Sequence, residues 1–266
     1  MKKASLALCS VVMVLLTALP ASASRHRRAH TAEVSTATSR AQPELLCQGG
    51  VLVTADDQIR GCTALVGRRL SRAKKSVAFY NRGNALMRKT RVVDAIADFS
   101  SALSLNPEYA QALFNRGIAY LIVSDKSAAF RDVNAYLALV PEDADALATR
   151  GAIYLAKNKL DLAGPDFDRA LARNPAQQVA LVNRGHIRLR SQRFAEALSD
   201  YEAALVLNPE NAEALFGRGV VRIATGHRTE GDSDIATAEV ADQGVTSRVA
   251  ALGVTAVSQP APQASP

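Results

Sequence analysis

The side chains most often used for catalysis or metal binding are few in this chain and widely spaced. The four histidines are His26, His30, His186 and His227, and no two of them have a metal-ligand spacing such as HExxH. The sequence has no Walker loop, no G-x-S-x-G elbow and no dinucleotide-binding fingerprint. His186 and Arg190 could contact an anionic ligand, but a solvated pair on one helix is the simpler interpretation. The sequence therefore predicts a protein that is not an enzyme and that uses no metal or cofactor.

Two cysteines, Cys47 and Cys62, could form a covalent cross-link. The third, Cys9, lies inside an apolar N-terminal run, and we expect it to be removed with that run. An even number of remaining cysteines in an exported chain favours a disulfide, with two buried free thiols as the alternative. A closed loop of about 15 residues would stabilise the fold by around 3 kcal/mol. The spacing excludes a CxxC redox site.

Residues 1–23 have the order of a secretory signal peptide. Lys2 and Lys3 precede an apolar run over residues 4–19, and the sequence ASA at residues 21–23 supplies a cleavage site. The run of 16 residues is short for a membrane-spanning helix, which needs about 20. The basic residues 25–28 favour a retained anchor instead, because they place more positive charge after the run than before it. We expect cleavage after Ala23 and a periplasmic or secreted protein with no stable membrane anchor; a retained anchor is the alternative.

The net charge of +7 is concentrated near the N-terminus. Residues 24–75 hold ten basic and four acidic residues, a net charge of +6, whereas residues 76–266 hold 20 basic and 21 acidic residues, a net charge of −1. Most of the chain therefore lacks the basic surface that binding of nucleic acid requires, and no nucleic-acid partner is expected. Residues 24–43 are rich in Ser, Thr, Ala and Arg without periodicity, so we expect a disordered basic segment.

One constant interval, which we call the repeat interval, runs through the rest of the chain. It is marked by five Arg-Gly pairs, at Arg82-Gly83, Arg116-Gly117, Arg150-Gly151, Arg184-Gly185 and Arg218-Gly219. In the first four units an alanine, an aspartate, an aromatic residue or valine, and a closing proline follow the glycine at constant spacing. An interval of this length is typical of an array of identical structural units. The fifth unit has Gly231 in place of the alanine and no proline, as expected of a terminal unit.

Each unit is predicted to be a hairpin of two helices that bends near residues 89–91 in the first copy. Apolar residues recur at helical spacing on both sides of this bend, among them Leu86 before it and Phe99 after it. The closing proline ends the second helix, because proline cannot continue a helix and restricts the preceding residue. Gly83 and Ala95 lie at similar heights, and such small residues allow close helix approach. No unit can bury its apolar face alone, so stability requires stacking.

Over residues 76–245, about 64% of its length, the chain resembles a tetratricopeptide repeat (TPR) protein, and in particular exported bacterial members of that family. The glycine, alanine, aromatic residue and proline all recur at the family's spacing, although Phe79 or leucine replaces the frequent tryptophan. The resemblance implies an all-α, right-handed α-solenoid of about five helix-turn-helix units. These span residues 76–109, 110–143, 144–177, 178–211 and 212–245, the last being degenerate. We also expect a Cys-containing N-terminal cap over residues 44–75, with a helix capped by Thr54, and a disordered tail over residues 246–266.

The repeated arginine and aspartate are predicted to form structural ion pairs. Arg82 lies about as far before the bend as Asp98 lies after it, so the two should face each other. Regular repetition favours this structural role, because ligand sites rarely recur identically in every unit. The predicted pairs are Arg82 with Asp98, Arg116 with Asp132, Arg150 with Asp166, and Arg184 with Asp200.

The resemblance implies that the first helix of each unit lines a concave groove, so binding residues should be groove residues that vary between units. Asparagine recurs at one groove position, and its amide can both donate to and accept from the backbone of an extended peptide. The alternative is that these asparagines only satisfy neighbours on their own helix. A clamp for C-terminal carboxylates is not expected, because Tyr80 and Asp145 stand where the family uses cations. The predicted groove residues are Tyr80, Asn81, Asn84, Phe114, Asn115, Ile118, Asn183, His186, Arg190 and Phe216.

The sequence thus favours an exported, non-enzymatic scaffold or adaptor that binds peptide or protein segments in its groove. Two other interpretations stay open. One is a structural homo-oligomer in which the ends of the arrays pack together. The other is a binder of anionic envelope surfaces that acts through the basic residues 25–75.

Overall fold

The computed structural model describes residues 42–255, which form thirteen α-helices and no strands. This confirms the predicted all-α class for the described residues. The predicted signal peptide, residues 24–41 and residues 256–266 lie outside them. The helices are α3 (Pro43–Gln48), α4 (Ala55–Val66), α5 (Arg72–Arg88), α6 (Val92–Leu105), α7 (Ala110–Ile122), α8 (Lys126–Leu139), α9 (Ala144–Ala156), α10 (Leu160–Arg173), α11 (Gln178–Arg190), α12 (Phe194–Leu207), α13 (Ala212–Ala224), α14 (Arg228–Ala241) and α15 (Val245–Ala251).

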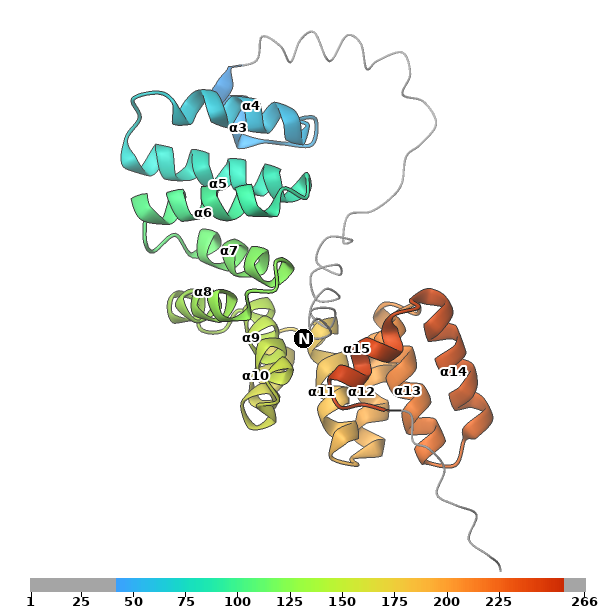
Figure 1. Cartoon of the computed structure of the whole chain (residues 1–266). Helices are drawn as coiled ribbons and strands as arrows, with labels where there is room; N and C mark the ends of the chain where they lie inside the picture. Colours follow the sequence, from blue (N-terminus) through green and yellow to red (C-terminus); the bar gives the residue numbers. More distant parts are fainter. Residues whose placement is uncertain (1–41, 256–266) are drawn as a thin grey trace, which may run out of the picture. The chain divides into compact units, whose positions relative to one another are not determined.

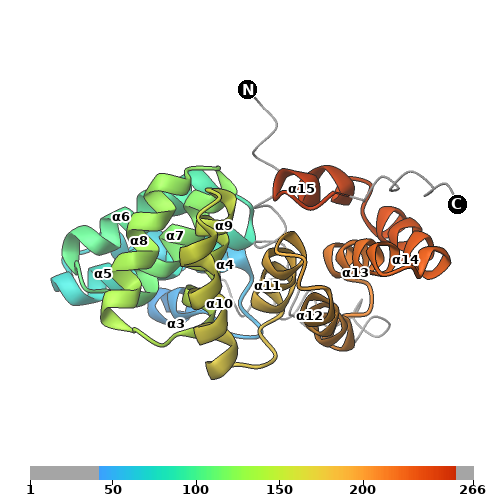
Figure 2. The same cartoon turned by 90° about the horizontal axis from the view of Figure 1, so that it is seen from below.

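Consecutive helices pair as hairpins that stack in two compact units (Figure 1). The N-terminal unit, residues 42–141, contains the hairpins α3–α4, α5–α6 and α7–α8, in which α4 packs on α5 and α6 packs on α7. The C-terminal unit, residues 142–255, contains α9–α10, α11–α12 and α13–α14, followed by α15 (Figure 2). The fold of each unit is thus a solenoid of helical hairpins, as the repeat pattern predicted.

The bend of every repeat hairpin contains one residue in the left-handed region of backbone space. These residues are Thr90, Ser124, Asn158, Gln192 and Gly226, each one repeat interval after the last. Glycine adopts this conformation without a steric cost and asparagine tolerates it, so the bends at Thr90, Ser124 and Gln192 are strained by about 1–2 kcal/mol each. Since the bends recur with the same geometry, the packing of the helices on either side must offset this strain.

The repeated glycine lets the two helices of a hairpin pack closely, and in three of the five hairpins its nearest partner is an aromatic ring rather than the predicted alanine. A Cβ atom on Gly83 would lie 2.6 Å from Cε1 of Phe99, and one on Gly151 would lie 2.7 Å from Cε1 of Phe167. Both phenyl rings are fully buried. Any side chain at these glycines would therefore displace the ring that fills the hairpin core.

The repeat interval extends past the five units in both directions. Gly49 precedes Gly83 by one interval, and Gly253 follows Gly219 by one interval. At both outer positions the glycine has a positive φ, 76° and 81°, and the adjacent helix stops within three residues. By their positions, α3 and α15 are therefore shortened equivalents of the first helices of the repeats, and α3 pairs with α4. Such ends cover apolar faces that a terminal unit of a repeat array would otherwise expose.

The prediction of a disordered tail was wrong for residues 246–255. This segment contains most of α15, and Arg248 pairs with Glu213 of α13 at 3.3 Å and with Asp242. The buried apolar side chains of this region are Val245, Val249, Leu252 and Val254. The spacing of Val245, Val249 and Leu252 is typical of a helix. It was overlooked because this segment has little similarity to the repeats.

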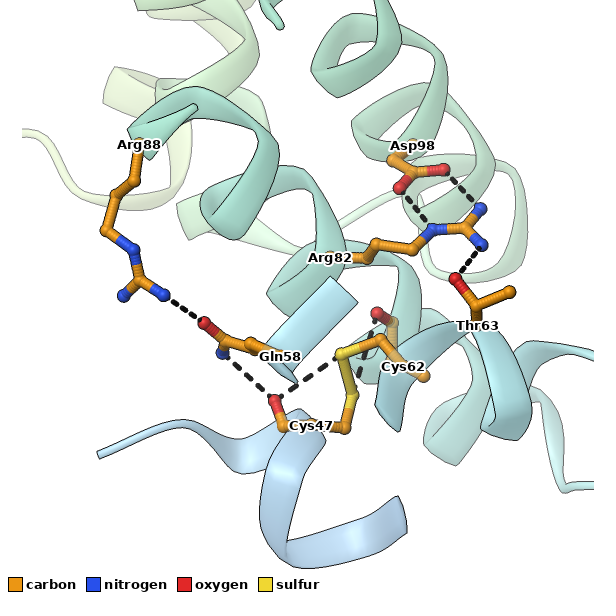
Figure 3. The surroundings of a disulfide bond; sticks show 8 residues. Cys47, Gln58, Cys62, Thr63, Arg82, Arg88 and Asp98 are labelled. Atoms are coloured by element: carbon orange, nitrogen blue, oxygen red, sulfur yellow. Dashed lines mark hydrogen bonds and ion pairs between the residues drawn. A yellow bond between two sulfur atoms is a disulfide. The ribbon is translucent and has the colours of Figure 1, made fainter. Parts of the chain in front are cut away.

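The N-terminal cap has the predicted helix start and contains the predicted disulfide. The Asp57 backbone N–H donates to Oγ1 of Thr54 at 3.1 Å. Cys47 on α3 is bonded to Cys62 on α4, and both are buried (Figure 3). Next to the disulfide, Gln58 donates from Nε2 to the Cys47 carbonyl oxygen at 3.0 Å and accepts from Arg88 of α5 at 2.6 Å. The cross-link and the Gln58 bridge together hold α3 against α4 and α4 against α5.

Candidate functional site

In the N-terminal unit, five of the predicted groove residues lie on neighbouring first helices. They form what we call the α5–α7 face, which consists of Tyr80, Asn84, Phe114, Asn115 and Ile118. All five side chains are partly exposed. The structure therefore brings these residues together on an accessible surface.

A hydrogen-bonded cluster of Tyr80, Asn84 and Asn115 lies on the α5–α7 face. Nδ2 of Asn115 donates to Oδ1 of Asn84 at 2.7 Å and to the Tyr80 hydroxyl oxygen at 3.3 Å. The Asn84 amide N–H groups and the Asn115 carbonyl oxygen make no other side-chain bond within residues 42–255. The cluster therefore keeps both donors and an acceptor that a ligand backbone can use.

Aromatic rings flank this cluster. The Tyr80 and Tyr109 rings lie 4.8 Å apart, and the Phe114 and Tyr136 rings lie 5.0 Å apart. Burial, together with the neighbouring Tyr80, raises the pKa of Tyr109 to about 12, so its hydroxyl stays neutral. Tyr109 and Tyr136 were not among the predicted site residues.

Asn81, predicted to lie in the same groove, lines a different cavity. It faces a pocket of about 440 Å³ between α3, α4 and α5, together with Cys47, Leu65 and Val77. Asn81 therefore lies beside the cap and outside the Tyr80–Asn84–Asn115 cluster.

In the C-terminal unit, the prediction of accessible groove residues was wrong for Asn183, His186 and Phe216. All three side chains are buried. Nδ2 of Asn183 donates to the Val179 carbonyl oxygen on its own helix, the role that the sequence left open as an alternative. Arg190 is partly exposed but already has partners: it donates to Oδ1 of Asn158 at 2.7 Å and to the Leu252 carbonyl oxygen at 2.9 Å. The sequence missed this burial because the groove positions alone do not reveal neighbours such as Tyr201, whose hydroxyl lies 2.8 Å from Nδ1 of His186.

The four predicted Arg–Asp pairs are all present, and a fifth joins Arg218 to Asp234. Each arginine contacts both carboxylate oxygens of its partner, as Arg82 does with Asp98 at 2.7 and 2.8 Å (Figure 3). The aspartates are buried, and the bond to Asp98 is the main cause of a raised pKa for Arg82.

The same arginines also reach the preceding hairpin. Nη1 of Arg82 donates to Oγ1 of Thr63 on α4 at 3.1 Å, and Nη1 of Arg116 donates to Oγ of Ser100 on α6 at 3.0 Å. In the C-terminal unit Arg184 bonds Asp168 of α10 in the same way. The pairs therefore tie each hairpin internally and also to its neighbour, which is a structural role.

Residues 42–255 contain no group of three or more His, Cys, Asp or Glu side chains arranged to hold a metal ion. Within the same residues, none of the helices combines the length and apolar character that crossing a membrane would need.

Stacked helical hairpins that recur at one constant interval define the class of helical-repeat proteins. A family model described as tetratricopeptide repeat matches residues 80–135 and 182–227. These two segments therefore match the tetratricopeptide repeat family, in agreement with the resemblance in the sequence.

Solved structures agree with this fold. YrrB, titled a TPR protein with an unusual peptide-binding site, is 21% identical with a TM-score of 0.55, covering 73% of this chain and 98% of its own. A structure of MamA is 18% identical with a TM-score of 0.53, covering 64% of this chain and 92% of its own. A double mutant of MamA from RS-1 is 18% identical with a TM-score of 0.55, covering 66% and 98%. Comparison with curated proteins found no match.

Proposed function

We propose that this chain is an exported, non-enzymatic scaffold that binds an extended protein segment on the α5–α7 face. The observation that carries the proposal is the cluster of Tyr80, Asn84 and Asn115. Its internal hydrogen bonds hold the amides in place, and the Asn84 N–H groups and the Asn115 carbonyl oxygen are left for a ligand. An extended peptide presents alternating backbone N–H and C=O groups, which pair with such amides without regard to sequence.

Selectivity for the bound segment would come from the surrounding side chains. The Phe114 and Tyr136 rings and Ile118 provide partly exposed apolar surface next to the amides. An apolar side chain of the ligand can therefore be buried while its backbone bonds the asparagines. Support also comes from YrrB, a protein of the same fold that is described as having a peptide-binding site. Tetratricopeptide repeats in general serve as scaffolds, which supports a role without catalysis.

Export is supported by two independent features. Residues 1–23 have the pattern of a cleavable signal peptide. The Cys47–Cys62 disulfide belongs to oxidising compartments, because cytosolic reductants keep most thiols reduced. Cell fractionation with mass determination tests this part. We expect a mature N-terminus at Ser24, whereas a full-length chain in the membrane fraction would contradict cleavage.

The binding proposal is tested with peptides selected by display of random extended sequences on the purified chain. Selected peptides should bind Asn84→Ala/Asn115→Ala at least tenfold more weakly than wild type. The control is Asn106→Ala, which makes the same chemical change at an exposed position of the same unit outside the face. Equal affinity for wild type and the double variant would overturn the assignment of the site.

A further inference from the structure

In the C-terminal unit, the chain that follows α15 lies against α11 and α13, next to Val220, which has the same repeat position as Asn84 and Ile118 of the α5–α7 face. The equivalent positions in successive first helices, each one repeat interval apart, are Asn84, Ile118, Ala152, His186 and Val220. Asn84 and Ile118 are partly exposed in the N-terminal unit, whereas the last three are buried in the C-terminal unit. Residues 252–255, which we call the strap, follow α15 and return to α11.

The strap contacts α11 through its backbone. Nη1 of Arg190 donates to the Leu252 carbonyl oxygen at 2.9 Å, while Nη2 of Arg190 is held by Asn158. A Cβ atom on Gly253 would lie 3.0 Å from Nε of Arg190, so a side chain at this position would push against the guanidinium group. Gly253 also has a φ of 81°, which turns the chain at this point.

The side chain of Val254 is buried, although the strap does not fill the surface that it covers. A pocket of about 610 Å³ remains between the strap, Leu189 of α11, and Val220 and Ile223 of α13. The strap is the C-terminal turn of α15, because the N–H groups of Gly253 and Val254 donate to the carbonyl oxygens of Ala250 and Val249. It meets the surface as a bound segment would, with one backbone carbonyl on a side-chain donor and one buried apolar side chain.

We propose that the surface formed by α11 and α13 is a second peptide-binding site and that the strap is its resident ligand. A tethered ligand competes at an effective concentration in the millimolar range, so a free segment of the same chemistry binds only weakly while the strap is docked. Release of the strap opens the site for a segment with an apolar-Gly-apolar sequence and a carbonyl placed for Arg190. This inference does not depend on the function proposed for the α5–α7 face.

The test uses the full chain and a fluorescent peptide with the sequence of residues 245–255. Val254→Asp places a charge at a buried position of the strap and should release it. We expect the peptide to bind this variant at least tenfold more tightly than wild type in fluorescence anisotropy. Adding Arg190→Ala to the variant should weaken binding at least tenfold, because the carbonyl loses its donor. Ala251→Asp is the matched control, since Ala251 is exposed in the same segment, and it should behave as wild type.

Equal binding of the peptide to wild type and to folded Val254→Asp, including no binding to either, would overturn the proposal. If Val254→Asp does not fold, hydrogen exchange on the wild-type chain decides. The Val254 N–H, bonded to the Val249 carbonyl oxygen, should then exchange at least tenfold faster than amides of α11 and α13. If the Val254 amide and the amides of α11 and α13 exchange at the same rate, they exchange through unfolding of the whole C-terminal unit. The strap would then not detach by itself, and the proposal would be overturned.

Discussion

The hydroxyl oxygen of Tyr201 lies 2.8 Å from Nδ1 of His186, and both side chains are fully buried in the C-terminal unit. Nε2 of His186 is buried without a partner in the described residues. Burial disfavours the charged imidazolium and lowers the pKa of His186 to about 3, from an ordinary 6.5. His186, which the sequence placed in the groove beside Arg190, is therefore a neutral core residue.

Acid should destabilise the C-terminal unit through His186. The pKa of His186 is lower in the folded state. Between about pH 6.5 and pH 3, the unfolded chain therefore binds a proton at His186 that the folded chain does not bind. The stabilisation is complete above pH 6.5 and falls by about 1.4 kcal/mol per pH unit below it. Denaturant unfolding at pH 7.5 and pH 4.5 should show a loss about 2–3 kcal/mol larger in wild type than in His186→Asn. His227→Asn, at an exposed histidine, should retain the wild-type loss; an identical loss in His186→Asn would contradict the prediction.

Two equivalent glycines of the N-terminal unit should respond in opposite ways to alanine. A Cβ atom on Gly83 would lie 2.6 Å from the Phe99 ring, whereas one on Gly117 would lie 3.1 Å from the smaller Val133. Gly83→Ala should destabilise by about 1–3 kcal/mol through overpacking. Gly117→Ala should be neutral or stabilise by up to about 1 kcal/mol, because alanine favours helices over glycine. Thermal unfolding of both variants checks this, and equal melting temperatures would show that the aromatic partner is irrelevant.

Breaking one Arg–Asp pair should cost more than removing both partners. Asp132 is buried, so Arg116→Ala leaves an uncompensated charge and should destabilise by about 3–5 kcal/mol. Arg116→Ala/Asp132→Ala removes that charge and should recover part of the loss. Urea unfolding measures both variants. A single variant within about 0.5 kcal/mol of wild type would exclude a structural role for this pair.

Reduction of the Cys47–Cys62 disulfide should loosen the cap. The bond closes a sequence separation of 15 residues, which corresponds to about 3 kcal/mol in the chain-entropy model. With a reductant, the amides of α3 should lose hydrogen-exchange protection before those of α7 and α8. The double variant Cys47→Ser/Cys62→Ser should show this low protection with or without reductant. If the hydrogen-exchange protection of α3 does not depend on the disulfide, the Gln58 bridge alone is enough to hold α3 against α4.

Much of the fold could be predicted because the same short pattern of residues recurs in successive repeats. The glycine recurs in all five units, and in the first four an aromatic residue or valine and a closing proline follow it, so chance similarity is excluded. The Arg–Asp pairs followed from their symmetric distance to the bend. The site was only partly predictable. Asn84 and Asn115 meet on the α5–α7 face, whereas Asn183, with the same repeat position as Asn115, bonds its own helix.

The sequence by itself determined the helices, the hairpins and the ion pairs, because these depend on short-range periodicity and on fixed spacing within one unit. Only the tertiary structure decided which face is open to a ligand. That outcome depends on contacts such as Arg190 with Leu252, which are 62 residues apart and follow no repeat rule. Gly49 and Gly253 show the same limit: they continue the repeat interval, yet each adopts a positive φ close to where its helix ends, which the repeat pattern did not predict.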